Sequence, residues 1–313
     1  MVDNIAREIW EYTQQIVKNT LGTQVKVKEF EWAAGGLFNK VFKVNTTDGN
    51  FVLKVECDKI FFATRKDQIE NEVIGNALFK KAGIPCANVL AYDYTKKDVG
   101  VRYVFMEWIK NDMKDWPIGG LEHFDEPIKS EIERQVKAIR EKEQSITNSH
   151  FGSLSQFGTL GWHETYDGYY HSTLNLLIKD SEEYGVFTDE ELAIVKKASE
   201  KPLVYSKKYI PTFDHGDMGY HNMIWGKNKV YVYDFGNAYF GLPYSEENIS
   251  EFENNLIGDF ERMFWRESER LTEDYAYMRD WMIPGVEAAK KDASRNHIID
   301  FLDKCRDLLT DFA

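Results

Sequence analysis

Residues 213–244, FDHGDMGYHNMIWGKNKVYVYDFGNAYFGLPY, decide the fold of this chain. Two short apolar runs flank the turn-forming residues 226–229, a pattern that predicts an antiparallel hairpin. If the turn centres near Asn228, residues 222 and 234 face one another across the ladder, where opposite β-carbons lie roughly 5 Å apart. We therefore expect the side chains of Asn222 and Asp234 to converge at the open end of the hairpin.

The side chains that this hairpin gathers are of the kind that binds a hard cation. An amide oxygen beside a carboxylate suits Mg²⁺, which takes one or two protein ligands and fills its other positions with phosphate and water. Asp217 lies one short loop before Asn222, close enough to act beside the metal without ligating it. A carboxylate there can accept a hydrogen bond from a hydroxyl group, orient it and take its proton. Each motif alone is common in turns, but their joint spacing indicates a catalytic site.

The amino-terminal third predicts a small antiparallel sheet with one helix. Runs typical of β-strands occur at 25–32, 40–45, 51–56, 87–94 and 101–108. The Asp48-Gly49 pair between the second and third runs is a strong hairpin signal. A helix is expected at 66–82. Its buried apolar stripe would consist of Ile69, Val73, Ala77 and Leu78.

The rest of the chain is mainly helical apart from the hairpin. Pro127 opens a predicted helix that ends near Gln144, and Thr188 begins the capping box of another. This order predicts an α+β chain of two lobes. The first, 1–109, contains the small sheet, and the second, 110–313, is larger and mainly helical.

The charge of the chain limits its partners. The 313 residues carry a formal net charge of −13, which argues against nucleic acids and anionic membranes, because both favour basic surfaces. The three cysteines form no Cys-x-x-Cys pair, so we expect reduced structural thiols. No stretch is apolar enough to span a bilayer, and we expect a cytoplasmic protein.

The loop His-Gly-Asp-x-x-x-x-Asn at 215–222, followed by the segment at Asp234, resembles the aminoglycoside phosphotransferase and choline kinase superfamily. The resemblance implies a bilobal protein-kinase-like fold and an ATP- and Mg²⁺-dependent small-molecule kinase. It assigns Asp217 as the catalytic base and His215 as the residue that organises the loop. Asn222 and Asp234 become the metal ligands.

The resemblance extends to the amino-terminal lobe, which would bind the nucleotide. Small residues in a phosphate-covering loop let backbone amides approach phosphate. Lys54 is similar to the lysine that contacts the α- and β-phosphates, and its partner would be Glu72 or Glu70. The segment 104–109 would join the lobes and meet adenine through its backbone. The implied nucleotide-binding residues are Gly35, Gly36, Asn39, Lys54, Glu72, Glu107 and Ile109.

The chain also departs from the family pattern after Asp234. Phe235 stands where the family commonly has Trp, and 246–248 reads Glu-Glu-Asn instead of Asp-Leu-Ala. Asp-Phe-Gly is similar to protein kinases, but no Ala-Pro-Glu motif or activation segment follows it, which argues against a protein substrate. We expect the hydroxyl group of a small molecule as the acceptor. The alternatives are a metabolic kinase of a neutral or zwitterionic alcohol, such as homoserine or a sugar, and a nucleotide-binding pseudokinase.

Acidic and aromatic residues near the carboxyl terminus are candidates for the acceptor site. Similar positions in the family help to form the acceptor cleft, and acids there would suit an aminoglycoside or a choline-like cation. A second candidate wall is 150–170, which is rich in glycine and aromatic residues. The acceptor, the choice of ATP or GTP, and the oligomeric state all stay open at this point. The carboxyl-terminal candidates are Glu251, Asp259, Glu261, Trp265, Glu267 and Asp274.

Overall fold

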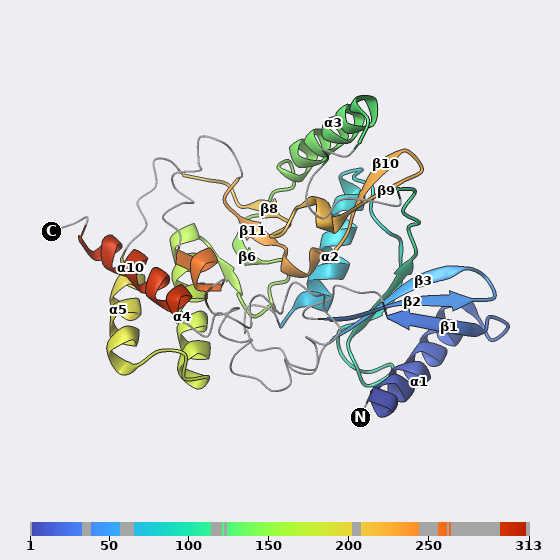
Figure 1. Ribbon diagram of the computed structural model, residues 1–313, viewed down its shortest axis with the longest axis horizontal. Helices are drawn as coiled ribbons and strands as arrows, with labels where there is room; N and C mark the ends of the chain where they lie inside the picture. Colours follow the sequence, from blue (N-terminus) through green and yellow to red (C-terminus); the bar gives the residue numbers. More distant parts are fainter. Residues whose placement is uncertain are drawn as a thin grey trace.

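A five-stranded antiparallel sheet in the order β1-β2-β3-β5-β4 builds the amino-terminal lobe (Figure 1). The computed structural model describes residues 2–32, 39–56, 66–113, 121, 124–201, 208–243, 256–261, 263 and 295–310. The predicted hairpin is confirmed, because β2 and β3 pair around a turn in which Gly49 has a φ of 138°. The strands are β1 (Val27–Trp32), β2 (Asn39–Thr46), β3 (Asn50–Glu56), β4 (Val89–Asp93) and β5 (Tyr103–Glu107).

Two helices pack on opposite faces of this sheet. α1 (Val2–Leu21) packs through Ile16 against the face that carries Leu53 and Phe105. α2 (Gln68–Lys81) packs against the other face, where Ile69 meets Val104 and Met106. Side chains alternate between the faces of a strand, so neighbouring residues of β5 serve different helices. α2 is the helix predicted at 66–82, and α1 precedes the first strand of the sheet.

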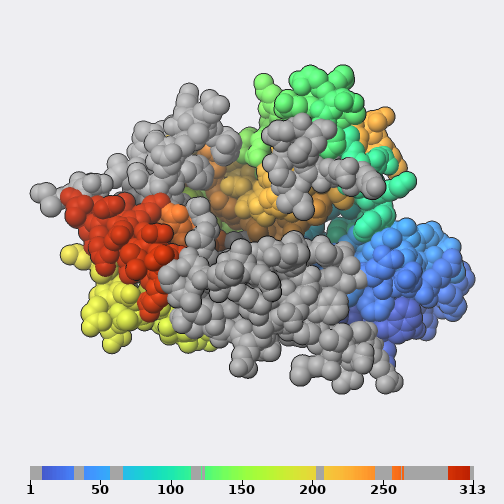
Figure 2. Space-filling model, viewed as in Figure 1, coloured from blue at the N-terminus to red at the C-terminus, as the bar shows by residue number. Residues whose placement is uncertain are grey.

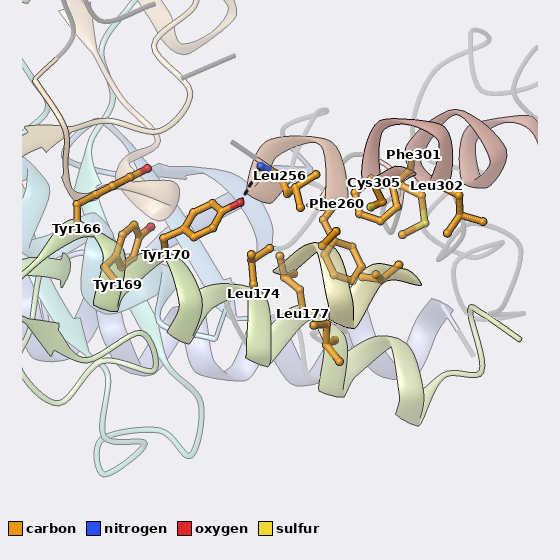
Figure 3. Close-up of a cluster of buried hydrophobic side chains, with 14 of the residues drawn as sticks. Tyr166, Tyr169, Tyr170, Leu174, Leu177, Leu256, Phe260, Phe301, Leu302 and Cys305 are labelled. Atoms are coloured by element: carbon orange, nitrogen blue, oxygen red, sulfur yellow. Dashed lines mark hydrogen bonds between the residues drawn. The ribbon is translucent and has the colours of Figure 1, made fainter. Parts of the chain in front are cut away.

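The second lobe combines a helical bundle with short strands. A four-stranded sheet has the order β7-β6-β11-β8, and β9 and β10 form a separate hairpin. Helices α4, α5 and α10 enclose an apolar core in which Leu177 packs with Phe260 and Phe301 (Figure 3). The capping box predicted at Thr188 and Glu191 is present. The strands are β6 (Phe151–Ser153), β7 (Trp162–His163), β8 (Thr212–Asp214), β9 (Met223–Gly226), β10 (Lys229–Val232) and β11 (Tyr239–Gly241); the helices are α3 (Glu126–Glu143), α4 (Tyr166–Glu183), α5 (Asp189–Ser199) and α10 (Asn296–Thr310).

The two lobes lie side by side along the long axis of the molecule. Figure 2 shows the blue atoms of the amino-terminal lobe at one end and the red atoms of α10 at the other. Gold and orange atoms of the segment 208–243 are visible between them. Cys86 and Cys305 are buried free thiols, and burial raises the pKa of each to about 12. Cys57 lies outside the described residues. Within the described part of the chain, no helix combines the length and apolarity that a bilayer crossing needs.

The last turn of α3 places a buried carboxylate beside the end of β8. The Glu143 side chain is buried, and its Oε1 accepts a hydrogen bond from the backbone N–H of His215 at 2.9 Å. Burial and the charge of Asp214 raise the pKa of Glu143 to about 8, although that hydrogen bond and Arg140 act in the opposite direction. Glu143 is therefore mainly protonated at neutral pH, and it holds the start of the loop after β8.

We expect Glu143→Gln to make the stability of the protein less dependent on pH in the range between the unfolded and the folded pKa of Glu143. The folded protein holds a proton on Glu143 that the unfolded chain releases near pH 4.5. The stability linked to this proton is complete below that pH and is lost as the pH rises through about 8. The melting temperature of the variant relative to that of the parent should therefore increase with pH, by roughly 5 °C between acid and alkaline buffers.

Thermal unfolding monitored across this pH range measures the difference. Glu131→Gln is the matched control, because Glu131 lies on the exposed side of the same helix and binds Arg134. A difference between the Glu143 variant and the parent that stays constant with pH would show that Glu143 does not titrate in this range.

Candidate active site

The loop after β8 is held by a buried histidine and a close backbone contact. His215 is fully buried, and its Nε2 donates to the carbonyl oxygen of Tyr233 at 3.0 Å. Burial lowers the pKa of His215, so the ring is neutral. Gly216 has a φ of 75°, and a Cβ atom there would lie 2.3 Å from the carbonyl oxygen of Asn237. The loop therefore packs directly on the segment that carries Asp234.

Asp217 is a half-exposed carboxylate with both oxygens hydrogen-bonded. Its Oδ2 accepts from Asn222 Nδ2 at 3.0 Å, and the same nitrogen donates to the backbone carbonyl of Asp217 at 2.8 Å. Its Oδ1 accepts from His221 Nε2 at 3.0 Å. Both donors lie on the short helix η2 (Tyr220–Asn222). The orientation of Asp217 is thus set within its own loop.

The predicted hairpin forms, but its register differs from the prediction by one residue. The N–H of Tyr233 donates to the carbonyl oxygen of Asn222 at 3.1 Å, so these two residues lie opposite each other. The expectation that Asn222 faces Asp234 across the ladder is wrong. Lys227 and Asn228 both have positive φ, 53° and 59°, which is typical of a two-residue turn. The turn is therefore centred half a residue earlier than the sequence suggested.

Asp234 leaves β10 in a left-handed backbone conformation. Its φ and ψ are 65° and 59°, a region that is costly for residues other than glycine and that clusters at functional sites. Its Oδ1 accepts from Lys54 Nζ at 2.5 Å, while 47% of the side chain stays exposed. Lys54 Nζ also donates to Glu72 Oε2 at 2.7 Å. Glu72, and not Glu70, is the helix partner of Lys54.

The two carboxylates determine the charge of Lys54. Burial alone would lower the pKa of Lys54, but the charges of Asp234 and Glu72 outweigh burial and raise that pKa above its usual value. In the same way, partial burial would raise the pKa of Asp234, but the charge and hydrogen bond of Lys54 lower it. Lys54 and Asp234 are therefore both ionised at neutral pH.

Two amide side chains of α2 bind the backbone and side chain that follow Asp234. Asn71 Nδ2 donates to the carbonyl oxygen of Gly236 at 3.1 Å. Gln68 Nε2 donates to Asn237 Oδ1 at 3.2 Å. Figure 1 shows α2 beside the amino-terminal sheet, with the orange segment that follows β10 next to it. The helix thus joins the amino-terminal lobe to the short helix η3 (Phe235–Asn237).

Phe235 packs against α2 at Gly75, where the helix carries no side chain. The ring is fully buried and meets Phe79 edge-on, with centroids 4.8 Å apart. A Cβ atom on Gly75 would lie 2.8 Å from the Cβ of Phe235. The predicted apolar stripe is correct at Ile69 and wrong at Ala77, which is exposed. Polar and small residues also face inward, because one side of the helix packs on the site while Ile69 and Phe79 pack in apolar clusters.

Asn39 belongs to the same hydrogen-bonded network. Its Nδ2 donates to Gln68 Oε1 at 2.5 Å, so the side chain joins β2 to α2. Within the described part of the chain, its buried Oδ1 has no hydrogen-bond partner. Gly35 and Gly36, predicted to cover the phosphates, lie outside the described residues.

The connection from β5 to the second lobe runs along the hairpin. The N–H of Asp112 donates to the carbonyl oxygen of Trp225 at 2.8 Å. The N–H of Glu107 donates to the carbonyl oxygen of Asn88 at 2.9 Å. The amide of Glu107 is therefore bound within the amino-terminal lobe.

The oxygen atoms of the site are of the type that Mg²⁺ prefers. Asn222 uses its amide nitrogen for Asp217, so its amide oxygen is the end that a cation would take. Asp234 gives one carboxylate oxygen to Lys54 and stays half exposed. A carboxylate and an amide oxygen beside a lysine fit a hard cation that also binds phosphate.

Several site residues escaped the sequence analysis. A stripe of polar and small residues at i, i+3, i+4 and i+7 on α2 could have indicated a helix packed on a polar site. That stripe consists of Gln68, Asn71, Glu72 and Gly75. His221 lies four residues after Asp217 within the same motif, so its spacing was the available signal, whereas Glu143 reaches His215 from 72 residues away and only in the folded chain.

Two of the acids predicted for the acceptor site are among the described residues. Asp259 forms an ion pair with Lys304 on α10, which assigns it to the packing of the bundle. Burial, with a contribution from the charge of Glu261, raises the pKa of Tyr169. Glu261 therefore lies near an aromatic residue of the predicted wall 150–170. Outside the described residues are Glu251, Trp265, Glu267 and Asp274.

Tyr169 connects this region to the catalytic loop. Its ring stacks on Tyr239 with centroids 5.7 Å apart. The hydroxyl of Tyr239 donates to Asp214 Oδ2 at 3.1 Å. A line of contacts thus leads from the neighbourhood of Glu261 to the residue that precedes the His-Gly-Asp motif.

Solved structures with the same fold were found by comparison of the whole chain. A candidate fructosamine-3-kinase from Haemophilus somnus 129PT has a TM-score of 0.57 at 12% identity, covering 96% of this chain and 97% of its own. A candidate aminoglycoside phosphotransferase from Ralstonia eutropha JMP134 has a TM-score of 0.54 at 11% identity, covering 97% and 98%. An aminoglycoside phosphotransferase in complex with GDP and kanamycin has a TM-score of 0.52 at 12% identity, covering 90% and 98%.

Comparison by sequence gave a different result. No family model and no curated protein matches the chain. At these low identities the structural likeness establishes the fold, and it does so over nearly the full length. This chain has the bilobal protein-kinase-like fold that these phosphotransferase and kinase structures share.

Proposed function

We propose that this protein is a small-molecule kinase that transfers the γ-phosphoryl group of Mg·ATP to a hydroxyl group. The observation that carries the proposal is Lys54, which lies between Glu72 and Asp234 at 2.7 and 2.5 Å. A loop in which Asn222 orients Asp217 lies next to this ion-paired group. The shared fold supports the proposal, and the contacts of these side chains give each a distinct role.

Lys54 and Asp217 act on the two ends of the transfer. Lys54, kept positive by its two carboxylates, would bind phosphate oxygens, and the backbone at Gly35 and Gly36 would cover them. Asp217 would accept a hydrogen bond from the acceptor hydroxyl and take its proton as the new O–P bond forms. In this chemistry alignment and electrostatics supply most of the acceleration.

Asn222 and Asp234 would hold the metal through an amide and a carboxylate oxygen. When bound, Mg²⁺ supplies positive charge that neutralises the β- and γ-phosphates. Glu72 would still hold Lys54 if the Asp234 carboxylate were shared with the metal. His215 is buried and neutral, so it organises the loop and carries no proton in the reaction.

The nucleotide base would lie against the connection between the lobes. The carbonyl of Glu107 and the backbone of Ile109 are the proposed contacts, and Met106 is buried behind them. ATP is the proposed donor. GTP is the alternative, because one phosphotransferase with this fold was solved with GDP.

For the acceptor we propose an amine-bearing alcohol, such as an aminoglycoside. The support is the line of contacts from Glu261 through Tyr169 and Tyr239 to Asp214, which combines carboxylates with aromatic rings. The carboxylates of Glu261 and Asp214 at the two ends of this line could bind the cationic groups of a polyamine-like sugar, while the buried Tyr169 lies between them. Homoserine and neutral sugars are the alternatives.

A nucleotide-consumption screen tests the proposed function. Mg·ATP or Mg·GTP is offered with kanamycin, a fructosamine, choline, homoserine and ribose. Consumption that depends on one of these acceptors supports a small-molecule kinase, and its identity decides between the acceptor classes. Nucleotide binding with no turnover on any alcohol, and none on water, would instead identify a pseudokinase.

We expect Asp217→Asn to bind Mg·ATP nearly as well as the parent while turnover falls by about two to four orders of magnitude. The amide preserves the shape of the side chain but cannot accept the proton. Asp303→Asn, a change at an exposed carboxylate of α10, is the control. Turnover near that of the parent at saturating substrate would remove Asp217 from the role of base.

Asp234→Ala should abolish metal-dependent nucleotide binding, and Asn222→Ala should weaken it less. Asp234 is the charged metal ligand of the proposal and also a partner of Lys54, whereas Asn222 contributes one neutral oxygen. Isothermal calorimetry with ATP, with and without Mg²⁺, measures both effects. Parent-like affinity of the Asp234 variant for Mg·ATP would contradict the proposed metal site.

Acceptor binding should weaken as salt rises if the acceptor is cationic, because charges in a partly exposed cleft are screened over roughly 8 Å at physiological ionic strength. Glu261→Gln should raise the KM of the acceptor several-fold and change kcat less. Asp259→Asn is the matched control, since Asp259 is engaged by Lys304. Salt-independent kinetics with a neutral acceptor would remove the acidic surface from the proposal.

A further inference from the structure

The Asp217 carboxylate lies at the surface, where packing cannot fix it. Its side chain is 46% exposed. Rotation of an aspartate carboxylate about its last bond has only a broad preference, so its plane must be set by hydrogen bonds. Asn222 Nδ2 holds one oxygen, and His221 Nε2 holds the other, each at 3.0 Å. One donor would fix the position of a single carboxylate oxygen, whereas two donors on different oxygens fix the plane of the carboxylate.

His221 is itself held by its neighbours. A Cβ atom on Gly219 would lie 2.4 Å from Cε1 and 2.5 Å from Nδ1 of the imidazole, so the ring packs directly on the glycine backbone. The hydroxyl of Tyr233 donates to the backbone carbonyl of His221. Because Tyr233 directly precedes Asp234, the same residue aligns His221 with the proposed metal segment.

We infer that His221 is a positioning residue that fixes the plane of the Asp217 carboxylate and hence the direction from which an acceptor hydroxyl must approach. The inference rests on the proposed function, since it concerns the same base. A carboxylate has about four lone-pair sites, and the two donors occupy one on each oxygen. The remaining sites of Asp217 then point in directions that the loop determines.

Loss of His221 should therefore affect chemistry and leave nucleotide binding unchanged. Reacting groups that lose alignment by a fraction of an ångström to one ångström lose roughly ten- to hundredfold in rate. We expect His221→Ala to lower kcat by that factor with an unchanged dissociation constant for Mg·ATP. His221→Gln should restore most of the rate, because the glutamine Nε2 can donate to Asp217 from nearly the same place.

Gly219→Ala provides an independent route to the same loss. The backbone of Gly219, with a φ of −109°, accepts a side chain, but the added methyl group occupies the space of the imidazole. The variant should match His221→Ala, and the double variant should be no worse than either single variant. His171→Ala is the matched control, because His171 binds Asp167 through the same atoms at the same i+4 spacing on α4.

Turnover is measured as Mg·ATP consumption, both with the acceptor found in the screen and with water alone. Crystal structures of the parent, His221→Ala and His221→Gln provide a readout that does not need activity. We expect one carboxylate orientation at Asp217 in the parent and the glutamine variant, and several in the alanine variant.

The two readouts separate this inference from the proposed function. A parent that consumes no nucleotide would refute the proposed function, while the crystal structures would still decide the role of His221. A single, unchanged Asp217 orientation in His221→Ala, or parent-like kcat in that variant, would overturn the inference. A loss of rate that His221→Gln does not restore would also count against it.

Discussion

One buried ammonium group, that of Lys54, joins the three parts of the chain on which the site depends. It lies on β3, the central strand of the first lobe, and its two contacts are Glu72 on α2 and Asp234 after β10. A buried charge that loses one partner costs roughly 3–5 kcal/mol. Lys54 therefore ties the sheet, the helix and the carboxyl-terminal lobe to one another, together with the packing of Phe79 on Phe235 and the hydrogen bond from Asn71 to Gly236.

The left-handed backbone conformation of Asp234 follows from the need to bring its carboxylate to Lys54. A continued strand would carry the side chain of residue 234 to the face opposite that of Tyr233. The left-handed conformation ends the strand and brings the carboxylate to Lys54. The cost of that conformation is offset by an ion pair in a partly dry environment, where charges interact more strongly than in water.

The sequence predicted those features that are encoded locally. The hairpin at Asp48-Gly49 and the capping box at Thr188 depend on residues within a few positions of each other, and both formed as expected. The register of the second hairpin depends on the left-handed conformations of Lys227 and Asn228, which the residue types alone do not specify. That is why Asn222 faces Tyr233.

The buried face of α2 shows the same limit for long-range packing. A periodicity argument looks for an apolar core, and it therefore selected Ala77, which is exposed. The partner of this helix is a polar segment more than 150 residues away in the chain, as the bond from Asn71 to Gly236 shows. The identities of the motif residues were readable from the sequence, whereas residues that support them from far along the chain, such as Glu143 and Gln68, depend on the tertiary structure.

Three glycines at the site restrict how this sequence can diverge, because neighbouring groups occupy the space that a side chain would need. Gly75 leaves room for Phe235, Gly216 for the carbonyl of Asn237, and Gly219 for the ring of His221. Positions 75 and 235 must therefore change together, because a larger residue at the first demands a smaller one at the second. Among homologues that keep Phe235, residue 75 should remain glycine, and lineages that lose His221 should be the ones in which residue 219 is free to vary.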